Sequence, residues 1–326
     1  MKQSRVFVIA EIGSNHNQDI DQAFYLMNIA KQAGADAVKF QSLKLDAVIA
    51  EEDISQDDIE LFNKIKLDET WYRELYEYAR KIGIECISAP TYLQAIMLLK
   101  ENGARYMKIA SPQTYGFPEL IKKVAQLNIK TIMSTGYCEE GEIERAVNLY
   151  QKYGDLDNLT LLHCISQYPT EVQKVNLNYM KVLQNKYGVS VGYSDHTLGI
   201  VAPVMAVAMG ATVIEKHLTL SRKMEGPDHY FALEPDEFQR MVTNIREAEQ
   251  MIGTGEKILT SFEKEFRDSV IMYPYAARDM KPGEQIEEND IRYFRSKTRG
   301  MSPWRVEQDL IGKVLEKTVM ENHKFE

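Results

Sequence analysis

The sequence predicts an α/β protein built on a (β/α)8 TIM barrel, followed by a small, mostly β C-terminal domain. From residue 6 to about residue 260, short runs rich in β-branched residues alternate with longer segments of helical periodicity. Eight such runs occur, and a long helical segment follows the eighth. Eight β/α units in a row are typical of a barrel. The alternative, a doubly wound open sheet, more often has fewer strands in a segment of this length.

The elements follow one another in a regular order along the chain. The expected strands cover residues 6–12, 37–41, 84–89, 106–110, 131–134, 159–164, 189–193 and 212–216. The expected helices include 21–33, 71–82, 117–127, 142–152, 200–209 and, after the eighth strand, 235–252. Several of these segments end in a glycine that suits a left-handed helix cap, namely Gly34, Gly83, Gly103 and Gly210.

The pattern changes after Gly255, and this change sets the expected domain boundaries. Residues 1–255 form the barrel, and residues 256–268 are a charged linker. Residues 269–326 carry short strand-like pieces and turns such as Lys281-Pro282-Gly283-Glu284. This last segment is near the lower size limit for a domain that folds alone.

Composition excludes several classes of protein. The chain has 326 residues, 44% apolar and 27% charged, which is ordinary for a globular protein. A net charge of -9 argues against a nucleic-acid partner, although a few local cations can still bind a small anion. The three cysteines, Cys86, Cys138 and Cys164, are far apart, as in a protein with reduced thiols. No apolar run is long enough for a membrane span or a signal peptide, so we expect a cytoplasmic protein with no membrane partner.

Polar residues gather at the C-terminal ends of the expected strands, where TIM barrels have their active sites. They include Glu11, Lys39, Gln41, Thr91, Lys108, Ser111, Ser134, His163, Ser166, Tyr168 and Ser194. Lys39 and Lys108 lie within apolar strands, and a lysine is costly to bury without an anion. Two lysines with several hydroxyls suit a phosphate or carboxylate. Taken singly, each has an ordinary alternative: a salt-bridged lysine, a turn hydroxyl or, for His163, a core histidine.

Two histidines, His196 and His217, each close an apolar run on the seventh and eighth strands. They lie beside the acidic residues Asp195 and Asp228, so a shared metal site is expected. Two imidazoles with oxygen donors fit Mn²⁺, Fe²⁺, Co²⁺ or Zn²⁺, and the residue types do not choose among these metals.

These motifs, taken in order, cover almost the whole chain. They are AEIGSNHN (10–17), VKFQ (38–41), SAPT (88–91), MKIAS (107–111), MSTG (133–136), HC (163–164), YPT (168–170), GYSDHT (192–197), EKHLT (215–219) and EGPDH (225–229). As a set they resemble the sialic acid synthase family, which includes the legionaminic and pseudaminic acid synthases. The segment AARDMKPGE (276–284) resembles the antifreeze-like, or SAF, domain that these enzymes carry.

The resemblance implies a condensation of phosphoenolpyruvate with an N-acylated amino sugar aldehyde, giving a nine-carbon 2-keto-3-deoxy acid and phosphate. It assigns phosphoenolpyruvate to Lys39, Thr91, Lys108, Ser111, Ser134 and Ser194. It assigns Mn²⁺, as a Lewis acid for the aldehyde, to His196 and His217. Glu11, Gln41, Tyr168 and Asp228 would face the sugar. The resemblance also implies a domain-swapped homodimer in which each SAF domain caps the partner's barrel.

Three positions depart from the family pattern. Gln113 stands where many members have an acid, so it would act by hydrogen bonding alone, or Glu11 would substitute. Ser166 stands where sialic acid synthases proper often have Asn. The SAF arginine that reaches the acyl group could be Arg295 or Arg299. Two rivals stay open: another phosphoenolpyruvate-dependent barrel synthase or aldolase, which takes a sugar phosphate, and a catalytically silent sugar-binding homologue.

Overall fold

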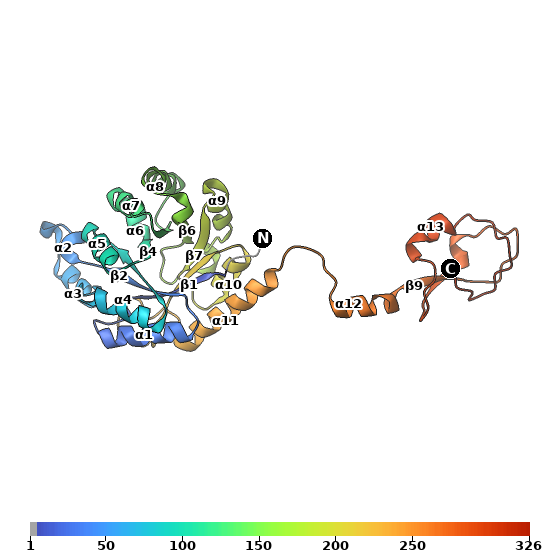
Figure 1. The fold of residues 1–326 in the computed structure, drawn as a ribbon, viewed down its shortest axis with the longest axis horizontal. Coiled ribbons are helices and arrows are strands. Elements are labelled where there is room, and N and C mark those ends of the chain that lie inside the picture. The colour runs from blue at the N-terminus through green and yellow to red at the C-terminus, as the bar shows by residue number, and fades with distance from the viewer. Residues whose placement is uncertain (1–4) are drawn as a thin grey trace. The chain divides into compact units, whose positions relative to one another are not determined.

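The computed structural model describes residues 5–326 and divides into two compact units. One unit ends at Thr254, and the other runs from Gly255 to Glu326. Figure 1 shows both units as a ribbon, coloured from blue at the N-terminus to red at the C-terminus.

The first unit is a nearly closed ring of eight parallel strands, which confirms the expected barrel. The strands are β1 (Phe7–Gly13), β2 (Ala37–Ser42), β3 (Glu85–Pro90), β4 (Tyr106–Ile109), β5 (Lys130–Ser134), β6 (Leu159–Cys164), β7 (Ser190–Asp195) and β8 (Val213–His217). Their order is β3-β2-β1-β8-β7-β6-β5-β4, so they follow the sequence around the ring. Each expected strand overlaps the observed one and differs at its ends by no more than two residues.

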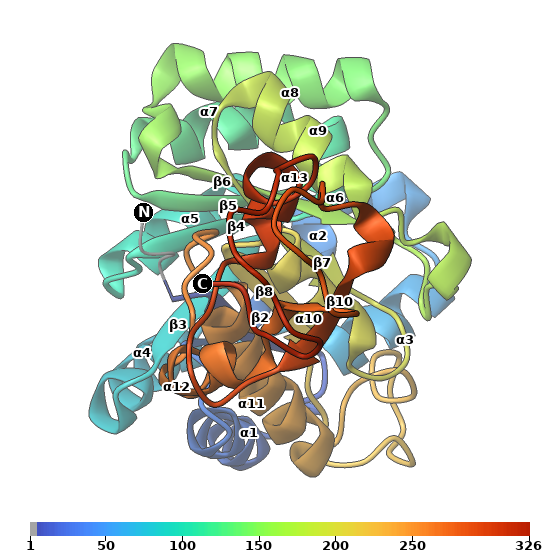
Figure 2. The same ribbon diagram turned by 90° about the vertical axis from the view of Figure 1, so that its right-hand side faces the viewer.

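Helices lie outside the strands (Figures 1 and 2). They are α1 (Ile20–Gln32), α2 (Leu45–Val48), α3 (Gln56–Ile65), α4 (Trp71–Ile82), α5 (Leu93–Glu101), α6 (Ser111–Gly116), α7 (Pro118–Gln126), α8 (Glu140–Tyr153), α9 (Asn178–Tyr187), α10 (Val201–Ala208) and α11 (Pro235–Ile252). Helix α11 shows why these segments are helical: Pro235 is at its first turn, and Glu234 and Glu237 form a reciprocal capping box. The predicted bounds of α4 and α11 are those observed.

The barrel interior contains a layer of apolar side chains. Ile9, Ala37, Ile87, Ile132, Leu162 and Val213 form it, with Phe7 and Tyr106 packed against them. Because side chains alternate along a strand, the residue two positions further on points to the same inner face. The next layer of inward-facing side chains therefore lies at the C-terminal ends of the strands, where TIM barrels have their active sites.

The second unit has its own small core of Ala276, Met280, Ile286, Val306, Leu310 and Phe325. Its strands β9 (Met272–Ala276) and β10 (Ile291–Arg295) pair in antiparallel fashion. Helices α12 (Ser261–Phe266) and α13 (Val306–Asp309) are short.

All three cysteines of the chain are free. Over residues 5–326, no helix has the length and apolar character that a membrane crossing requires.

Candidate active site

A cavity of about 320 Å³ opens at the C-terminal ends of the barrel strands. The predicted site residues that line it are Glu11, Lys39, Gln41, Thr91, Lys108, Ser111, Gln113, Ser134, Tyr168, Ser194, His196 and His217. A larger cavity, of about 810 Å³, is lined by residues that begin the strands, such as Phe7, Glu85 and Lys130. Because TIM-barrel chemistry occurs at the other end, we place the active site in the smaller cavity.

The second inner layer of the barrel brings the charged residues together. Two positions after Ile9, Ala37, Tyr106 and Val213 come Glu11, Lys39, Lys108 and Glu215, in that order. All four of these charged side chains are buried. Glu215 was not predicted as a site residue, although it was part of a recognised motif. The alternation of Val213, Glu215 and His217 along β8 is the signal that could have identified it.

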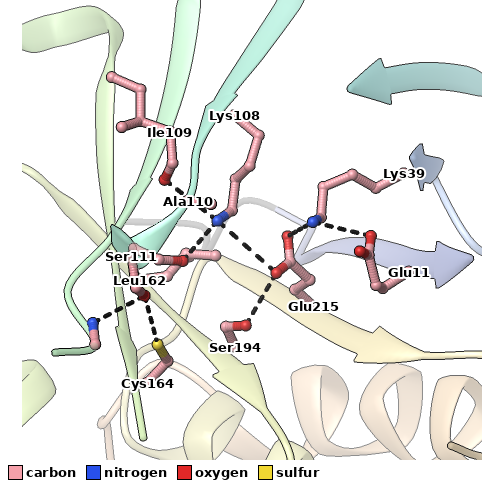
Figure 3. A network of polar contacts seen from close by, with 12 residues as sticks. Glu11, Lys39, Lys108, Ile109, Ala110, Ser111, Leu162, Cys164, Ser194 and Glu215 are labelled. Atoms are coloured by element: carbon pink, nitrogen blue, oxygen red, sulfur yellow. Dashed lines mark hydrogen bonds and ion pairs between the residues drawn. The ribbon is translucent and has the colours of Figure 1, made fainter. Parts of the chain in front are cut away.

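The buried charges form one network (Figure 3). The Nζ of Lys39 lies 2.9 Å from Oε2 of Glu11 and 3.7 Å from Oε2 of Glu215. The Nζ of Lys108 lies 3.9 Å from Oε1 of Glu215. The hydroxyl of Ser194 donates a hydrogen bond to that same Oε1, at 2.9 Å. Glu215 therefore holds two ammonium groups at the floor of the cavity, in a region where burying a single charge would be costly.

The two carboxyl groups of this network titrate differently. Burial raises the pKa of Glu11 to about 7, and the charge of Lys39 offsets only part of that effect. Burial also acts to raise the pKa of Glu215, but the charges of Lys108 and Lys39 outweigh it and lower that pKa to about 2. Burial likewise lowers the pKa of Lys108. Near neutral pH the site thus holds one fixed carboxylate and one carboxyl group that can exchange a proton.

Small polar side chains surround Gly136 beside the lysines. The amide of Gly136 donates to Oγ of Ser111 at 3.0 Å, and that Oγ is 3.2 Å from the sulfur of Cys164. A Cβ atom at Gly136 would lie 2.2 Å from Oγ of Ser166 and 2.8 Å from Oγ of Ser111. Glycine is therefore required for this close approach. Ser166 lies beside the main cavity and lines an adjoining one of about 400 Å³. On the Lys108 side, Nζ of that lysine donates to Oγ of Ser134 at 2.6 Å.

Three polar side chains converge over Gly13 on the opposite side of the site. Nε2 of Gln41 donates to Oε1 of Glu11 at 2.9 Å. A Cβ atom at Gly13 would lie 2.9 Å from Oδ2 of Asp228, 3.2 Å from Oε1 of Glu11 and 3.5 Å from Nε2 of Gln41. Gly13 has a φ of +54°, in the left-handed region that favours glycine. Glu11, Gln41 and Asp228, the residues predicted to face the sugar, are therefore neighbours, although Asp228 is far from the other two in the sequence.

The histidine pair lies against an aromatic side chain. The ring centroids of His196 and His217 are 5.5 Å apart, and the Tyr168 ring is 4.2 Å from that of His196. Burial lowers the pKa of both histidines to about 4, so both are neutral near pH 7. Nδ1 of His196 donates to the carbonyl of Ile165 at 2.9 Å, which leaves the lone pair on its Nε2 free.

These histidines fit a metal as two neutral ligands. Nδ1 of His217 is buried and has no hydrogen-bond partner among the described residues. Within residues 5–326, no group of three or more His, Cys, Asp or Glu side chains is arranged to hold a metal ion. The remaining donors would then be oxygens from water or substrate, as in an open catalytic site.

The other predicted residues have these positions. His163 is a core histidine: its Nε2 donates to the carbonyl of Val175 at 2.7 Å, and it packs against Tyr179. Oε1 of Gln113 is buried and has no hydrogen-bond partner among residues 5–326. Arg295 and Arg299 belong to the second unit, where they line a cavity of about 510 Å³ and Arg299 pairs with Asp268. Further lining residues that were not predicted are Leu43, Val48, Ala89, Ala110, Pro112, Tyr137 and Cys164.

A (β/α)8 barrel with two buried lysines, two carboxyl groups and two neutral histidines at its C-terminal end defines the chain as a barrel enzyme. The chain belongs to the NeuB family, which residues 26–257 match. It is 39% identical to N,N'-diacetyllegionaminic acid synthase of Campylobacter jejuni, over 98% of each chain. It is 34% identical to pseudaminic acid synthase of the same species, over 97% of this chain and 94% of the relative.

A solved structure agrees with these relatives. The chain is similar to N-acetylneuraminic acid synthetase from Leptospira borgpetersenii, whose crystal structure contains citrate, with a TM-score of 0.75 and 32% identity. That similarity covers 82% of this chain and 93% of the other. The family, the fold and the cavity residues are therefore consistent with an enzyme that makes sialic-acid-like sugars.

Proposed function

We propose that this chain is a phosphoenolpyruvate-dependent nonulosonate synthase. It condenses phosphoenolpyruvate with an N-acylated amino sugar aldehyde to give a nine-carbon 2-keto-3-deoxy acid and inorganic phosphate. The observation that carries the proposal is the buried network in which Glu215 separates Lys39 from Lys108. Two ammonium groups that share one internal carboxylate have hydrogen-bonding capacity left for an incoming anion.

In this proposal one side of the cavity binds phosphoenolpyruvate. Lys39 and Lys108 neutralise its phosphate and carboxylate groups, and nearby hydroxyls provide further polar contacts to the same oxygens, with Thr91 and Ser194 turning their hydrogens away from the Ser42 carbonyl and from Glu215 to do so. These hydroxyls are Thr91, Ser111, Ser134 and Ser194, all of which line the cavity. Fixed cations and oriented donors in a buried site stabilise a developing negative charge more strongly than water does.

The other side binds the sugar through Glu11, Gln41, Tyr168 and Asp228, with Ser166 and Gln113 nearby. His196 and His217 would hold Mn²⁺, which supplies Lewis-acid chemistry for the aldehyde oxygen when it is bound. C3 of phosphoenolpyruvate forms a bond to the aldehyde carbon, and the aldehyde oxygen takes up a proton. Water then adds to C2 and loses one proton; the C2–O bond to phosphate breaks, and the C2 hydroxyl passes its remaining proton to the departing phosphate as the ketone forms. Glu11, with a pKa of about 7, is suited to move one of these protons.

The resemblance of residues 276–284 to a SAF domain extends the proposal to the second unit. We propose that the protein is a domain-swapped homodimer and that Arg295 or Arg299 of the SAF domain contacts the acyl group of the sugar. A lid of this kind would exclude water from a reactive intermediate.

Phosphate release tests the proposal. The protein is mixed with phosphoenolpyruvate, Mn²⁺ and a panel of acceptors: N-acetylmannosamine, 2,4-diacetamido-2,4,6-trideoxyhexoses and sugar phosphates. We expect phosphate release with an unphosphorylated amino sugar, a nine-carbon keto acid by mass spectrometry, and loss of both with EDTA or in Lys108→Met. Release with sugar phosphates alone would favour the rival synthase. Silence across the panel would favour the sugar-binding homologue.

A further inference from the structure

The loop after β8 is joined to the loop after β1 by a set of buried and partly buried hydrogen bonds. Nδ2 of Asn15 donates to the carbonyl of Leu218 at 2.9 Å. The hydroxyl of Ser14 donates to Oδ2 of Asp228, also at 2.9 Å. These contacts join residues that are more than 200 positions apart in the sequence. They give the Ser14-Asn15-His16-Asn17 segment a structural role. The proposed reaction assigns this segment no chemical role.

His229 is at the centre of this connection. Its ring is fully buried, with Nδ1 2.6 Å from Oγ1 of Thr219 and Nε2 2.9 Å from Oδ1 of Asn17. The amide oxygen of Asn17 can only accept, so the proton is on Nε2, and Nδ1 accepts from the hydroxyl of Thr219. Burial lowers the pKa of His229, which agrees with a neutral ring. Both ring nitrogens are therefore fully used in fixing the loop, and neither is free for a ligand.

The backbone passes closely over this pair. Gly226 has a φ of +148°, and a Cβ atom there would lie 2.7 Å from Cδ2 of His229 and 3.4 Å from Oδ1 of Asn17. A side chain at residue 226 would have to displace the imidazole or the amide. The loop conformation thus depends on glycine at one position and on the His229–Asn17 hydrogen bond at the other.

The residues next to His229 reach the acceptor side of the site, where the sugar aldehyde (the acceptor of the proposed reaction) would bind. Asp228 places its carboxylate over Gly13, close to Glu11. The hydroxyl of Tyr230 donates to the carbonyl of Tyr168 at 2.5 Å. The ring of Phe231 lies 4.8 Å from that of His217 and 5.2 Å from that of Tyr168. Three residues that flank one buried histidine therefore reach the site: Asp228 lies near Glu11, and Tyr230 and Phe231 contact Tyr168 and His217.

We propose that His229, held between Thr219 and Asn17, is a positioning residue that sets Asp228 and the aromatic wall of Tyr168 and Phe231 for the sugar aldehyde. It acts through these side chains and does not touch the substrate. The phosphoenolpyruvate side of the site is built on β2, β4, β5, β7 and Thr91 after β3. Among the hydrogen bonds of the described residues, none joins that side to the clasp formed by Thr219, His229 and Asn17. The inference rests on the proposed function for the identity of the ligand, and on geometry for the rest.

Steady-state kinetics of paired variants test the inference. His229→Phe and Asn17→Ala each remove the hydrogen bond of the clasp, whereas His229→Gln keeps an N–H at the Nε2 end. We expect the first two to raise KM for the acceptor about tenfold or more, with KM for phosphoenolpyruvate changed less than about twofold. His229→Gln should recover most of the loss. Tyr150→Phe is the matched control, because it removes a different buried hydrogen bond, to Thr131 at 3.0 Å.

A structural role without positioning predicts another result. In that case His229→Phe would lower the melting temperature as Tyr150→Phe does and leave KM for the acceptor within about twofold, which would overturn the inference. If wild-type protein turned over no acceptor, the proposed function would fail first. A crystal structure of His229→Phe would then decide the inference alone: a retained Ser14–Asp228 hydrogen bond would overturn it, and a displaced Asp228 would support it.

Discussion

The Nζ of Lys216 lies 2.5 Å from Oδ2 of Asp195, in an ion pair whose side chains are 1% and 0% exposed. Lys216 precedes His217, and Asp195 precedes His196. The two residues are also partners in the register of β7 and β8. The ion pair therefore cross-links the two strands directly before the histidines, at the strand ends that carry the two imidazoles.

We expect Lys216→Met to leave Asp195 as an unpaired buried charge. Removing one partner of a buried pair typically costs about 3–5 kcal/mol in the free energy of unfolding. Urea unfolding in metal-free buffer measures this loss, and titration with Mn²⁺ should show weaker binding than to wild type. Asp195→Asn, which keeps the shape of the side chain, gives a second measurement if the methionine variant does not fold.

The control for this prediction is Lys186→Met. Lys186 forms exposed ion pairs with Glu140 and Glu144, at 2.8 and 2.9 Å. Exposed pairs contribute little, so its unfolding midpoint should stay near that of wild type. Equal midpoints for Lys186→Met and Lys216→Met would show that the buried pair has no special structural role.

Glu215→Gln should make the protein more dependent on an added anion. The substitution removes the carboxylate shared by Lys39 and Lys108 and leaves two buried ammonium groups to repel each other. We expect a lower melting temperature in phosphate-free buffer. Inorganic phosphate should then raise the melting temperature of Glu215→Gln by more than it raises that of wild type. An equal rise in both proteins would mean that phosphate does not bind beside these lysines.

Gly13→Ala should damage the acceptor side selectively. The new Cβ atom would lie 2.9 Å from Oδ2 of Asp228 and 3.2 Å from Oε1 of Glu11. Gly188→Ala is a close control, since Gly188 also has a left-handed φ, of +66°, but nothing lies within 4 Å of its added Cβ. Both variants should lose about 1 kcal/mol of stability from the backbone. Only Gly13→Ala should raise KM for the acceptor, and a similar rise in both would contradict the placement of Asp228.

His16 should make the protein less stable in acid. Burial lowers the pKa of His16 to about 4 from 6.5, so its contribution to stability is complete above pH 6.5 and is lost as the pH falls to about 4. Near pH 5 the unfolded chain binds a proton that the folded chain does not, which costs about 2 kcal/mol. His16→Gln should therefore reduce the difference in the free energy of unfolding between about pH 7.5 and pH 5 by about 2 kcal/mol.

Urea unfolding of both proteins at the two pH values measures this difference. Glu11 acts in the opposite direction, because its raised pKa gives a contribution that is complete below pH 4.5 and is lost as the pH rises through about 7. That contribution is the same in wild type and His16→Gln and cancels in the comparison. An unchanged pH difference would show that His16 is protonated in the folded protein.

The sequence was sufficient for the barrel because its signal is local. Runs of β-branched residues predicted each strand, and the rule that barrel sites lie at strand ends selected Lys39, Lys108 and Ser194. Glu215 was missed because attention fell on His217 at the strand end. Glu215 lies two residues earlier on the same inward face of β8, where its carboxylate lies between the two lysines. Strand periodicity was enough to find it, but the motif alone was not.

Other features depend on contacts between distant segments. The approach of Asp228 to Gly13 is set by hydrogen bonds between two loops at opposite ends of the barrel sequence, and no local pattern encodes it. The position of Ser166 in an adjoining cavity depends on the close packing of Gly136 against Cys164. The assignment of Arg295 or Arg299 to the sugar remains a prediction, because it concerns a different unit of the chain.

The pairing of β1 with β8 determines when, during synthesis of the chain, the site can form. Glu11 and His217 are register partners in these two strands, so the acid with the raised pKa and one histidine of the proposed metal site become neighbours only when the first strand meets the last. A chain still on the ribosome, with β8 not yet made, contains all the lysines and hydroxyls proposed to bind phosphoenolpyruvate but cannot assemble the side proposed to bind the sugar. The residues proposed to bind the sugar therefore come together only after β8 has been made, and no fragment that lacks β8 should act on a sugar.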